Sequence, residues 1–141
     1  MIPYDSPHHR RGEHIEARYG RRARLSLLDF QDFAWLAADL VSRGKPAYAR
    51  DVQLRLAAEA IIHKLGESVA RLPTSLVEAH PEIPFRLLKA MRNLIAHEYD
   101  RADPEIIWQT LAVELPRVTA QVASIVDDPA GEPETHRGDI R

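Results

Sequence analysis

The stretch ARDVQLRLAAEAIIHKLGESVAR, about residues 49–71, carries a repeating pattern of apolar side chains. These recur every three or four positions, at Leu54, Ala58, Ile61, Leu65, Val69 and Leu72. An α-helix makes one turn in about 3.6 residues, so this spacing places them all on one face. The stretch therefore predicts a long amphipathic helix with one side turned toward a core.

The regions on both sides of this stretch show the same spacing. Residues 24–43 (RLSLLDFQDFAWLAADLVSR) predict an earlier helix that is closed by Gly44 and Pro46. Three prolines in residues 73–84 predict a linker, and a third helix is expected from there through LLKAMRNLIAHEY, which ends at residue 99. Nowhere do apolar and polar residues alternate over five positions as they do in a strand.

The start of a fourth helix is marked by residues typical of a helix N-terminus. Asp103 is suited to the N-cap, Pro104 to the first helical position and Glu105 to the positive end of the helix dipole. The helix is expected to continue through IIWQTLAVELPRVTAQVASIV, with a kink at Pro116. Four amphipathic helices with short connections predict an all-α protein, an antiparallel four-helix bundle.

The composition limits the kinds of function to consider. A chain of 141 residues has room for one domain with one core. It contains no cysteine, which excludes disulfides, thiolate metal sites and cysteine nucleophiles. Its net charge of -2 argues against nucleic-acid binding through overall charge, although a local basic cleft is compatible with it. No run of residues is apolar enough for a membrane span or a signal peptide, so we expect a cytoplasmic protein.

The two ends of the chain differ in charge from the middle. Residues 1–24 hold six arginines and three acidic residues, while residues 127–141 hold five acidic residues and two arginines. We therefore predict a basic N-terminal extension over residues 1–23, a helical bundle over residues 24–127 and a flexible acidic tail over residues 128–141. The basic extension is open to two interpretations: a solvated leader, or a helical or phosphate-binding arm.

The third predicted helix carries the side chains with the most chemistry. At about 100° per residue, its apolar side is formed by Leu87, Leu88, Met91, Leu94 and Ile95. The opposite side holds Lys89, Arg92, Asn93, Ala96, His97 and Tyr99. Such a polar face is also what an ordinary solvated helix shows, so spacing alone does not decide its function. Arginine offers a charged fork for a phosphate, and histidine can move protons near neutral pH.

The segment MRNLIAHEYD, residues 91–100, resembles the R-x4-H-x-Y signature of the HepT-like HEPN ribonucleases. Arg92, His97 and Tyr99 stand in the signature positions, and Asn93 in the polar position after the arginine. The flanking blocks GESVARLP (66–73), HPEIPFRLLKAMRN (80–93) and DPEIIWQTLAVELP (103–116) also resemble segments of this family. The resemblance covers about residues 50–125, and the ordered blocks make it more specific than the short motif alone.

The resemblance implies a HEPN-type bundle that forms a homodimer. Arg92 and His97 point about 140° apart on one regular helix, so either the helix frays by His97 or a second subunit supplies the missing partner. In the homodimer that the resemblance implies, two copies of each side chain would converge on one RNA backbone. The resemblance also implies a toxin whose antitoxin is a nucleotidyltransferase of the MntA type. In the family that partner transfers AMP to the motif tyrosine, which is Tyr99 here, and the added phosphate would repel RNA.

These observations lead to a hypothesis of a metal-independent endoribonuclease that needs no cofactor. The catalytic residues would be Arg92, Asn93 and His97: His97 would act as general acid or base, Arg92 would stabilise charge at phosphorus, and Asn93 would bind the phosphate or orient His97. Lys89, Tyr99 and Arg101 would contribute to RNA binding. The alternative is a non-catalytic HEPN module that binds a nucleotidyltransferase and presents its substrate.

Four further side chains outside the motif are open to a functional or a structural interpretation. Glu67 either faces the cleft or is a plain surface carboxylate, and His63 is expected at the helix surface or in packing. Trp35 and Trp108 are expected to be anchors of the core or of a dimer interface.

Overall fold

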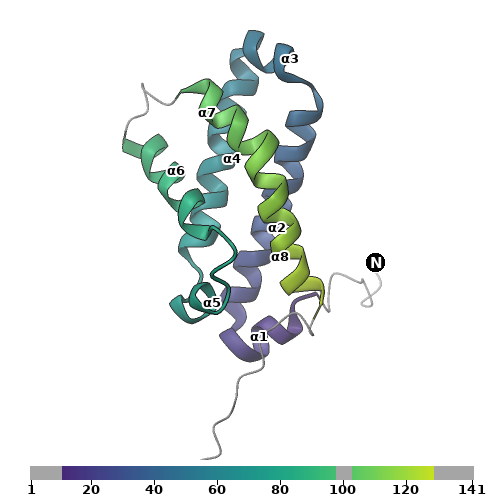
Figure 1. Ribbon diagram of the computed structural model, residues 1–141, viewed down its shortest axis with the longest axis vertical. Coiled ribbons are helices and arrows are strands. Elements are labelled where there is room, and N and C mark those ends of the chain that lie inside the picture. The colour runs from purple at the N-terminus through teal and green to yellow at the C-terminus, as the bar shows by residue number, and fades with distance from the viewer. Residues whose placement is uncertain (1–10, 98–102, 129–141) are drawn as a thin grey trace, which may run out of the picture.

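A computed structural model of the protein describes residues 11–97 and 103–128, with side chains described as far as Asn93 in the first of these ranges (Figure 1). All regular elements in these ranges are helical. They are α1 (Glu13–Tyr19), α2 (Arg21–Ser42), α3 (Lys45–Arg50), α4 (Val52–Ala70), α5 (Thr74–Ala79), α6 (Phe85–His97), α7 (Pro104–Gln109), the π-helical segment η3 (Thr110–Glu114) and α8 (Leu115–Asp127).

The long helices α2, α4 and α6, together with the continuous run of α7, η3 and α8, form one bundle. Successive members of the bundle run in alternating directions, and α4 lies between α2 and α6 (Figure 1). Their inward faces close around a core in which Phe30, Phe85, Leu65 and Leu111 are almost inaccessible to solvent. The predicted all-α antiparallel bundle is confirmed.

Residues 13–19 and 21–23, within the predicted basic extension, are helical, and both segments contribute to the core. Ile15 of α1 and Ala23 of α2 are both buried. Arg24 donates to Glu16 (2.8 Å) and to the carbonyl oxygen of Arg11 (2.9 Å), which ties the start of the described chain to α2. For this part of the extension, the helical interpretation holds and the solvated leader does not, because an apolar side chain at position 15 anchors α1.

The predicted second helix begins later than expected and is preceded by a separate short helix. Gly44 adopts a φ of 90°, which favours glycine, and α3 follows with Pro46 in its first turn. Asp51 then takes an extended conformation, and its side chain accepts a hydrogen bond from the backbone N–H of Gln53 (2.9 Å). Pro46 therefore starts a helix here instead of only ending the one before it.

The segment between α4 and α6, predicted to be a linker, contains the short helix α5. Leu76 of α5 is fully buried, and the backbone N–H of Val77 bonds the carbonyl oxygen of Pro73. Six residues are too few for a recognisable periodic pattern, so the sequence marked only the prolines around them. α5 covers the end of the bundle where α4 stops and α6 begins (Figure 1).

The fourth helical run begins as predicted and contains a π-helical segment. Asp103 caps α7 by accepting a hydrogen bond from the backbone N–H of Glu105 (2.9 Å). Further along, the N–H of Leu115 bonds the carbonyl oxygen of Thr110, which is the five-residue step of a π-helix. Pro116, which has no N–H to donate, stands in the first turn of α8, so the widened turn directly precedes the position where we predicted a kink.

The surface of the described part combines polar and apolar side chains. Trp35 is 69% exposed, which excludes it from the core and leaves the interface role as a prediction. Trp108 is half-buried and packs against the ring of Tyr48, with the ring centroids 5.0 Å apart. In the described residues, none of the helices combines the length and the apolar character that crossing a membrane requires.

Candidate functional site

The buried face of α6 is rotated from the one that periodicity predicts. Leu88 and Met91 are buried as expected, and Phe85 at the start of the helix is buried with them. Leu87, predicted to face the core, is instead 38% exposed. The face of α6 that packs on the core is therefore rotated toward Arg92. Arg92 lies at the edge of the contact between α6 and α4, and the prediction that it lies opposite the core is wrong.

Gly66 allows α4 and α6 to approach each other closely beside Arg92. A Cβ atom at position 66 would lie 2.3 Å from the Cβ of Arg92 and 3.0 Å from the carbonyl oxygen of Leu88. No real side chain tolerates such a contact, so glycine is required for the two helices to touch here. The stem of Arg92 fills the space above Gly66, and this contact fixes where its guanidinium group begins.

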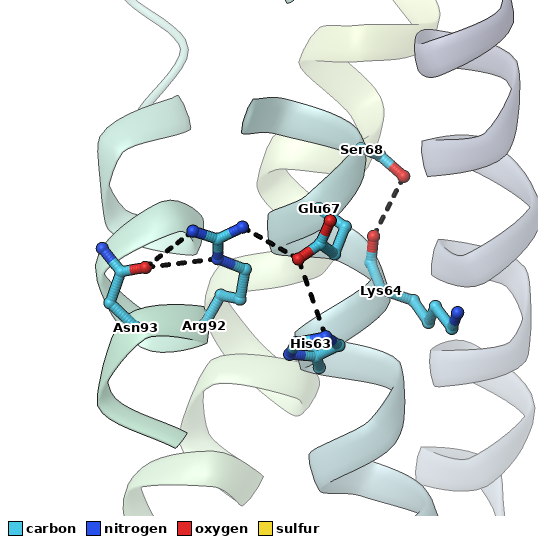
Figure 2. A network of polar contacts seen from close by, with 6 residues as sticks. All are labelled: His63, Lys64, Glu67, Ser68, Arg92 and Asn93. Atoms are coloured by element: carbon cyan, nitrogen blue, oxygen red, sulfur yellow. Dashed lines mark hydrogen bonds and ion pairs between the residues drawn. The ribbon is translucent and has the colours of Figure 1, made fainter. Parts of the chain in front are cut away.

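Two polar side chains hold the guanidinium group of Arg92 (Figure 2). Its Nη1 donates to Oε1 of Glu67 on α4 at 2.9 Å. Its Nε and Nη2 both donate to Oδ1 of Asn93, at 3.2 and 2.9 Å. These contacts use three of the five N–H groups of the arginine, so two remain to bind an oxyanion as far as the described side chains are concerned.

The carboxylate of Glu67 also connects Arg92 to a histidine. Nε2 of His63, one turn earlier on α4, lies 3.7 Å from Oε1 of Glu67 (Figure 2). The side chains of Arg92, Glu67 and His63 are 23%, 34% and 42% exposed, so the cluster is open to a ligand from solution. His63 lies at the helix surface as expected, and Glu67 is not a plain surface carboxylate because it holds the guanidinium group.

The remaining predicted site residues are placed less completely. Lys89 lies one turn before Arg92 on α6 and lines a pocket between α4, α5 and α6. His97 is the last residue of α6, and its side chain lies outside the described part of the chain. Tyr99 and Arg101 also lie outside the described residues. The structure thus brings Arg92 and Asn93 together with Glu67, whereas the meeting of Arg92 with His97 stays a prediction.

The described residues hold no group of three or more histidine, aspartate or glutamate side chains arranged to bind a metal ion. His14 bonds the carbonyl oxygen of Ile125 through its Nε2 atom at 2.5 Å. The described cluster itself places an arginine fork beside a carboxylate and an imidazole. A fork of this kind suits a phosphate or another oxyanion.

Comparison with known proteins supports the same kind of protein. A family model described as ribonuclease HepT-like matches residues 31–125, which include the whole Arg92–Glu67 cluster. The match covers more than half of the chain, so the protein belongs to the ribonuclease HepT-like family. No solved structure matches the chain significantly.

Individual relatives carry names that agree with this family. One is a candidate RNase from Methanocaldococcus jannaschii, 30% identical over 81 residues, which cover 57% of this chain and 67% of the relative. Another candidate RNase, from Caldanaerobacter subterraneus subsp. tengcongensis, is 32% identical over 79 residues, which cover 56% of this chain and 70% of the relative. A protein assigned as ribonuclease HepT from Thermococcus cleftensis is 29% identical over 66 residues, 47% of this chain and 60% of that protein.

Proposed function

We propose that this protein is an endoribonuclease that cleaves RNA without a metal ion. The observation that carries the proposal is the guanidinium group of Arg92, fixed by Glu67 and Asn93 and still partly exposed, in a chain of the ribonuclease HepT-like family. A phosphodiester of RNA presents the oxyanion that this fork can bind. RNA also carries its own nucleophile, the 2′-hydroxyl, so no external one is required.

In the proposed reaction, the 2′-oxygen attacks the adjacent phosphorus atom and the bond from phosphorus to the 5′-oxygen breaks. A base takes the proton of the 2′-hydroxyl, and an acid gives a proton to the leaving 5′-oxygen. His97 performs one of these transfers, and Arg92 stabilises the extra negative charge that builds up on the phosphoryl oxygens. Asn93 acts mainly through Arg92, since its carbonyl oxygen accepts two of the guanidinium N–H groups.

The direct test is cleavage of a mixed RNA pool by the purified protein. We expect cleavage to persist in excess EDTA, and His97→Ala to abolish it while the circular dichroism spectrum stays helical. If chelation stops the reaction and added metal restores it, the metal-independent mechanism is wrong. If His97→Ala cleaves as fast as the parent, His97 has no role in proton transfer.

We further propose that the active form is a homodimer with Arg92 and His97 near the two-fold axis. On a regular helix the two side chains point about 140° apart, so one subunit does not direct both at the same phosphate. Sedimentation at micromolar concentration should give about twice the chain mass of 16.0 kDa. A monomer that still cuts RNA would remove the argument.

The protein is also proposed to be the toxin of a pair whose antitoxin is an MntA-type nucleotidyltransferase. The partner would attach AMP to Tyr99, since this tyrosine stands in the R-x4-H-x-Y position. Incubation with the cognate transferase, ATP and Mg²⁺ should add AMP at Tyr99 and lower RNA cleavage in parallel. Tyr99→Phe should keep much of the activity and escape inhibition, and a label found on another residue would exclude Tyr99 as the acceptor.

The alternative function is a non-catalytic module that presents a substrate to a nucleotidyltransferase. Both functions predict a complex with such a partner, but only the ribonuclease requires RNA cleavage by the isolated protein. Growth arrest on expression, compared between the parent and Arg92→Ala, separates the two in cells. Arrest that persists unchanged in Arg92→Ala would favour the non-catalytic module.

A further inference from the structure

A pocket of about 200 Å³ lies beside the Arg92 cluster, where α4 ends and α6 begins. Its wall combines apolar and polar surface in similar proportion, and it is formed by residues of α4, α5 and α6 and of the turn between α4 and α5. Two basic side chains, Arg86 and Lys89, are among its lining residues, and no acidic residue of the described part of the chain lines it. The apolar part of the lining consists of Val69 from α4, Leu72 from the turn after α4, Val77 from α5 and Phe85 from α6, while Thr74 completes it.

The helix that forms one side of this pocket is strongly basic. Within α6, Arg86, Lys89 and Arg92 follow one another at intervals of three residues, and its sequence FRLLKAMRNLIAH contains no acidic residue. In a chain with a net charge of -2, this is a local concentration of positive charge. Each interval advances about 4.5 Å along the helix axis, so the three cations form a continuous row from the pocket to the Arg92 cluster.

We propose that the pocket is a nucleobase subsite for the RNA that Arg92 binds. One base of the strand inserts into the pocket against its apolar side chains, and Arg86 and Lys89 bind the phosphates that link this nucleotide to the one at Arg92. The inference rests on the proposed ribonuclease function and adds to it a fixed position at which the enzyme reads a nucleotide.

The size and the charge of the pocket both favour this occupant. A cavity of about 150 Å³ is known to accept a benzene-sized ring, so 200 Å³ is enough for one planar base. A peptide partner with an apolar side chain would fit the same volume, but the basic row along α6 favours a strand with regularly spaced negative charges. Recognition of single-stranded RNA commonly combines an unstacked base in an apolar site with cationic contacts to the backbone.

The test measures binding separately from cleavage. Fluorescent 2′-O-methyl oligonucleotides lack the nucleophilic hydroxyl, so fluorescence anisotropy reports their affinity without any reaction. A series in which one nucleotide at a time is abasic should contain one position where the loss of the base weakens binding at least about five-fold. Equal affinity across the whole series would overturn the subsite, even if the protein cleaves RNA.

Variants then locate the subsite in the structure. Val77→Phe fills the pocket from α5, so it should weaken binding of the intact oligonucleotide and remove the difference from the abasic one. Val113→Phe makes the same change at an exposed site on η3, and it should behave like the parent. If Val77→Phe is folded and keeps the full base dependence, the base binds elsewhere and the proposal is wrong.

The contribution of Arg86 and Lys89 can be measured from how strongly oligonucleotide binding depends on salt concentration. Arg86→Gln and Lys89→Gln should weaken intact and abasic oligonucleotides equally, because phosphates are present in both. Each lost phosphate contact should flatten the slope of log affinity against log salt by about 0.7, the value for single strands. An unchanged slope in the double variant would show that the strand does not follow α6. Cleavage of unmodified RNA by the parent protein tests the proposed function independently.

Discussion

Helices α6 and α8 both contain 13 residues and both bury one apolar face, but they differ in what they present on the other side. α8 has Arg117 as its one basic residue, and its buried face consists of Leu115, Val118, Val122, Ile125 and Val126. α6 carries three basic residues and no acidic one. An amphipathic pattern therefore establishes that a helix packs, while the charges beside the contact indicate whether it also has a binding function.

The two helices also differ in how they meet their neighbours. α6 approaches α4 so closely at Gly66 that the stem of Arg92 rests on glycine. α8 packs against α2 through branched side chains, and a groove between these two helices is lined by Ala34 and Leu115. Close contact at Gly66 leaves the arginine little freedom, which is what a phosphate-binding group requires for a defined orientation.

The largest effect on cleavage is expected from a comparison of two arginines, Arg92 on α6 and Arg117 on α8. Arg92→Ala should lower kcat/KM for RNA cleavage at least about 100-fold, because it removes the group that we propose to stabilise transition-state charge. Arg117→Ala removes an exposed arginine from α8 and should leave kcat/KM unchanged. Equal losses in the two variants would mean that general charge, and not the fixed guanidinium group, supports the reaction.

The next effect concerns the close contact itself. Gly66→Ala would place a methyl group 2.3 Å from the Cβ of Arg92, so α4 and α6 must separate. We expect a loss of about 1–3 kcal/mol in the free energy of unfolding, typical of overpacking, together with reduced cleavage. Ala120→Val adds volume to the exposed side of α8 and should change stability much less. Thermal unfolding followed by circular dichroism compares the two, and a fully stable Gly66→Ala would contradict the contact.

A smaller effect is expected from the carboxylate that orients Arg92. Glu67→Gln keeps a hydrogen-bond acceptor but removes the charge, so kcat/KM should fall about ten-fold with little change in stability. The matched pair on α8 is Asp127, whose Oδ1 lies 3.2 Å from Nε of Arg11. Asp127→Asn should leave cleavage unchanged, because this exposed ion pair is far from the motif in sequence and holds no proposed catalytic group. Faster cleavage by Glu67→Gln would show that Glu67 competes with RNA for Arg92.

The smallest effect is expected at the start of the run that leads into α8. Asp103→Ala removes the side chain that caps α7 and should lower the free energy of unfolding by about 1 kcal/mol. Asp103→Ser keeps an acceptor and should recover most of this loss. Urea unfolding monitored by circular dichroism is the measurement, and an Ala variant as stable as the parent would show that the cap contributes nothing.

The elements that sequence predicted well are those whose signals are local. Asp103 capped its helix as expected, because the cap depends only on neighbouring backbone groups. The short helices α3 and α5 were missed, since six residues do not reveal a period. Family membership was correctly predicted from several ordered blocks.

The details of the site were harder to predict because they depend on which helix packs beside α6. Periodicity averages over a whole helix, so it placed Leu87 in the core and Arg92 on the far side. The face of α6 that packs on α4 is instead set by the contact of Arg92 with Gly66, which lies 26 positions before it in the chain. The same long-range contact joins Glu67 to Arg92, which is why sequence reasoning mentioned Glu67 without assigning it a partner. The pairing of Arg92 with His97 stays a prediction.

The two tryptophans provide built-in optical probes of different events. Trp35 on α2 is 69% exposed, so its fluorescence should resemble that of an indole in water until another molecule covers that face. Trp108 packs against Tyr48, and its emission should report whether α7 stays docked on α3. A blue shift from Trp35 at constant Trp108 signal would therefore register association without unfolding, and single Trp→Phe variants would assign each component of the spectrum.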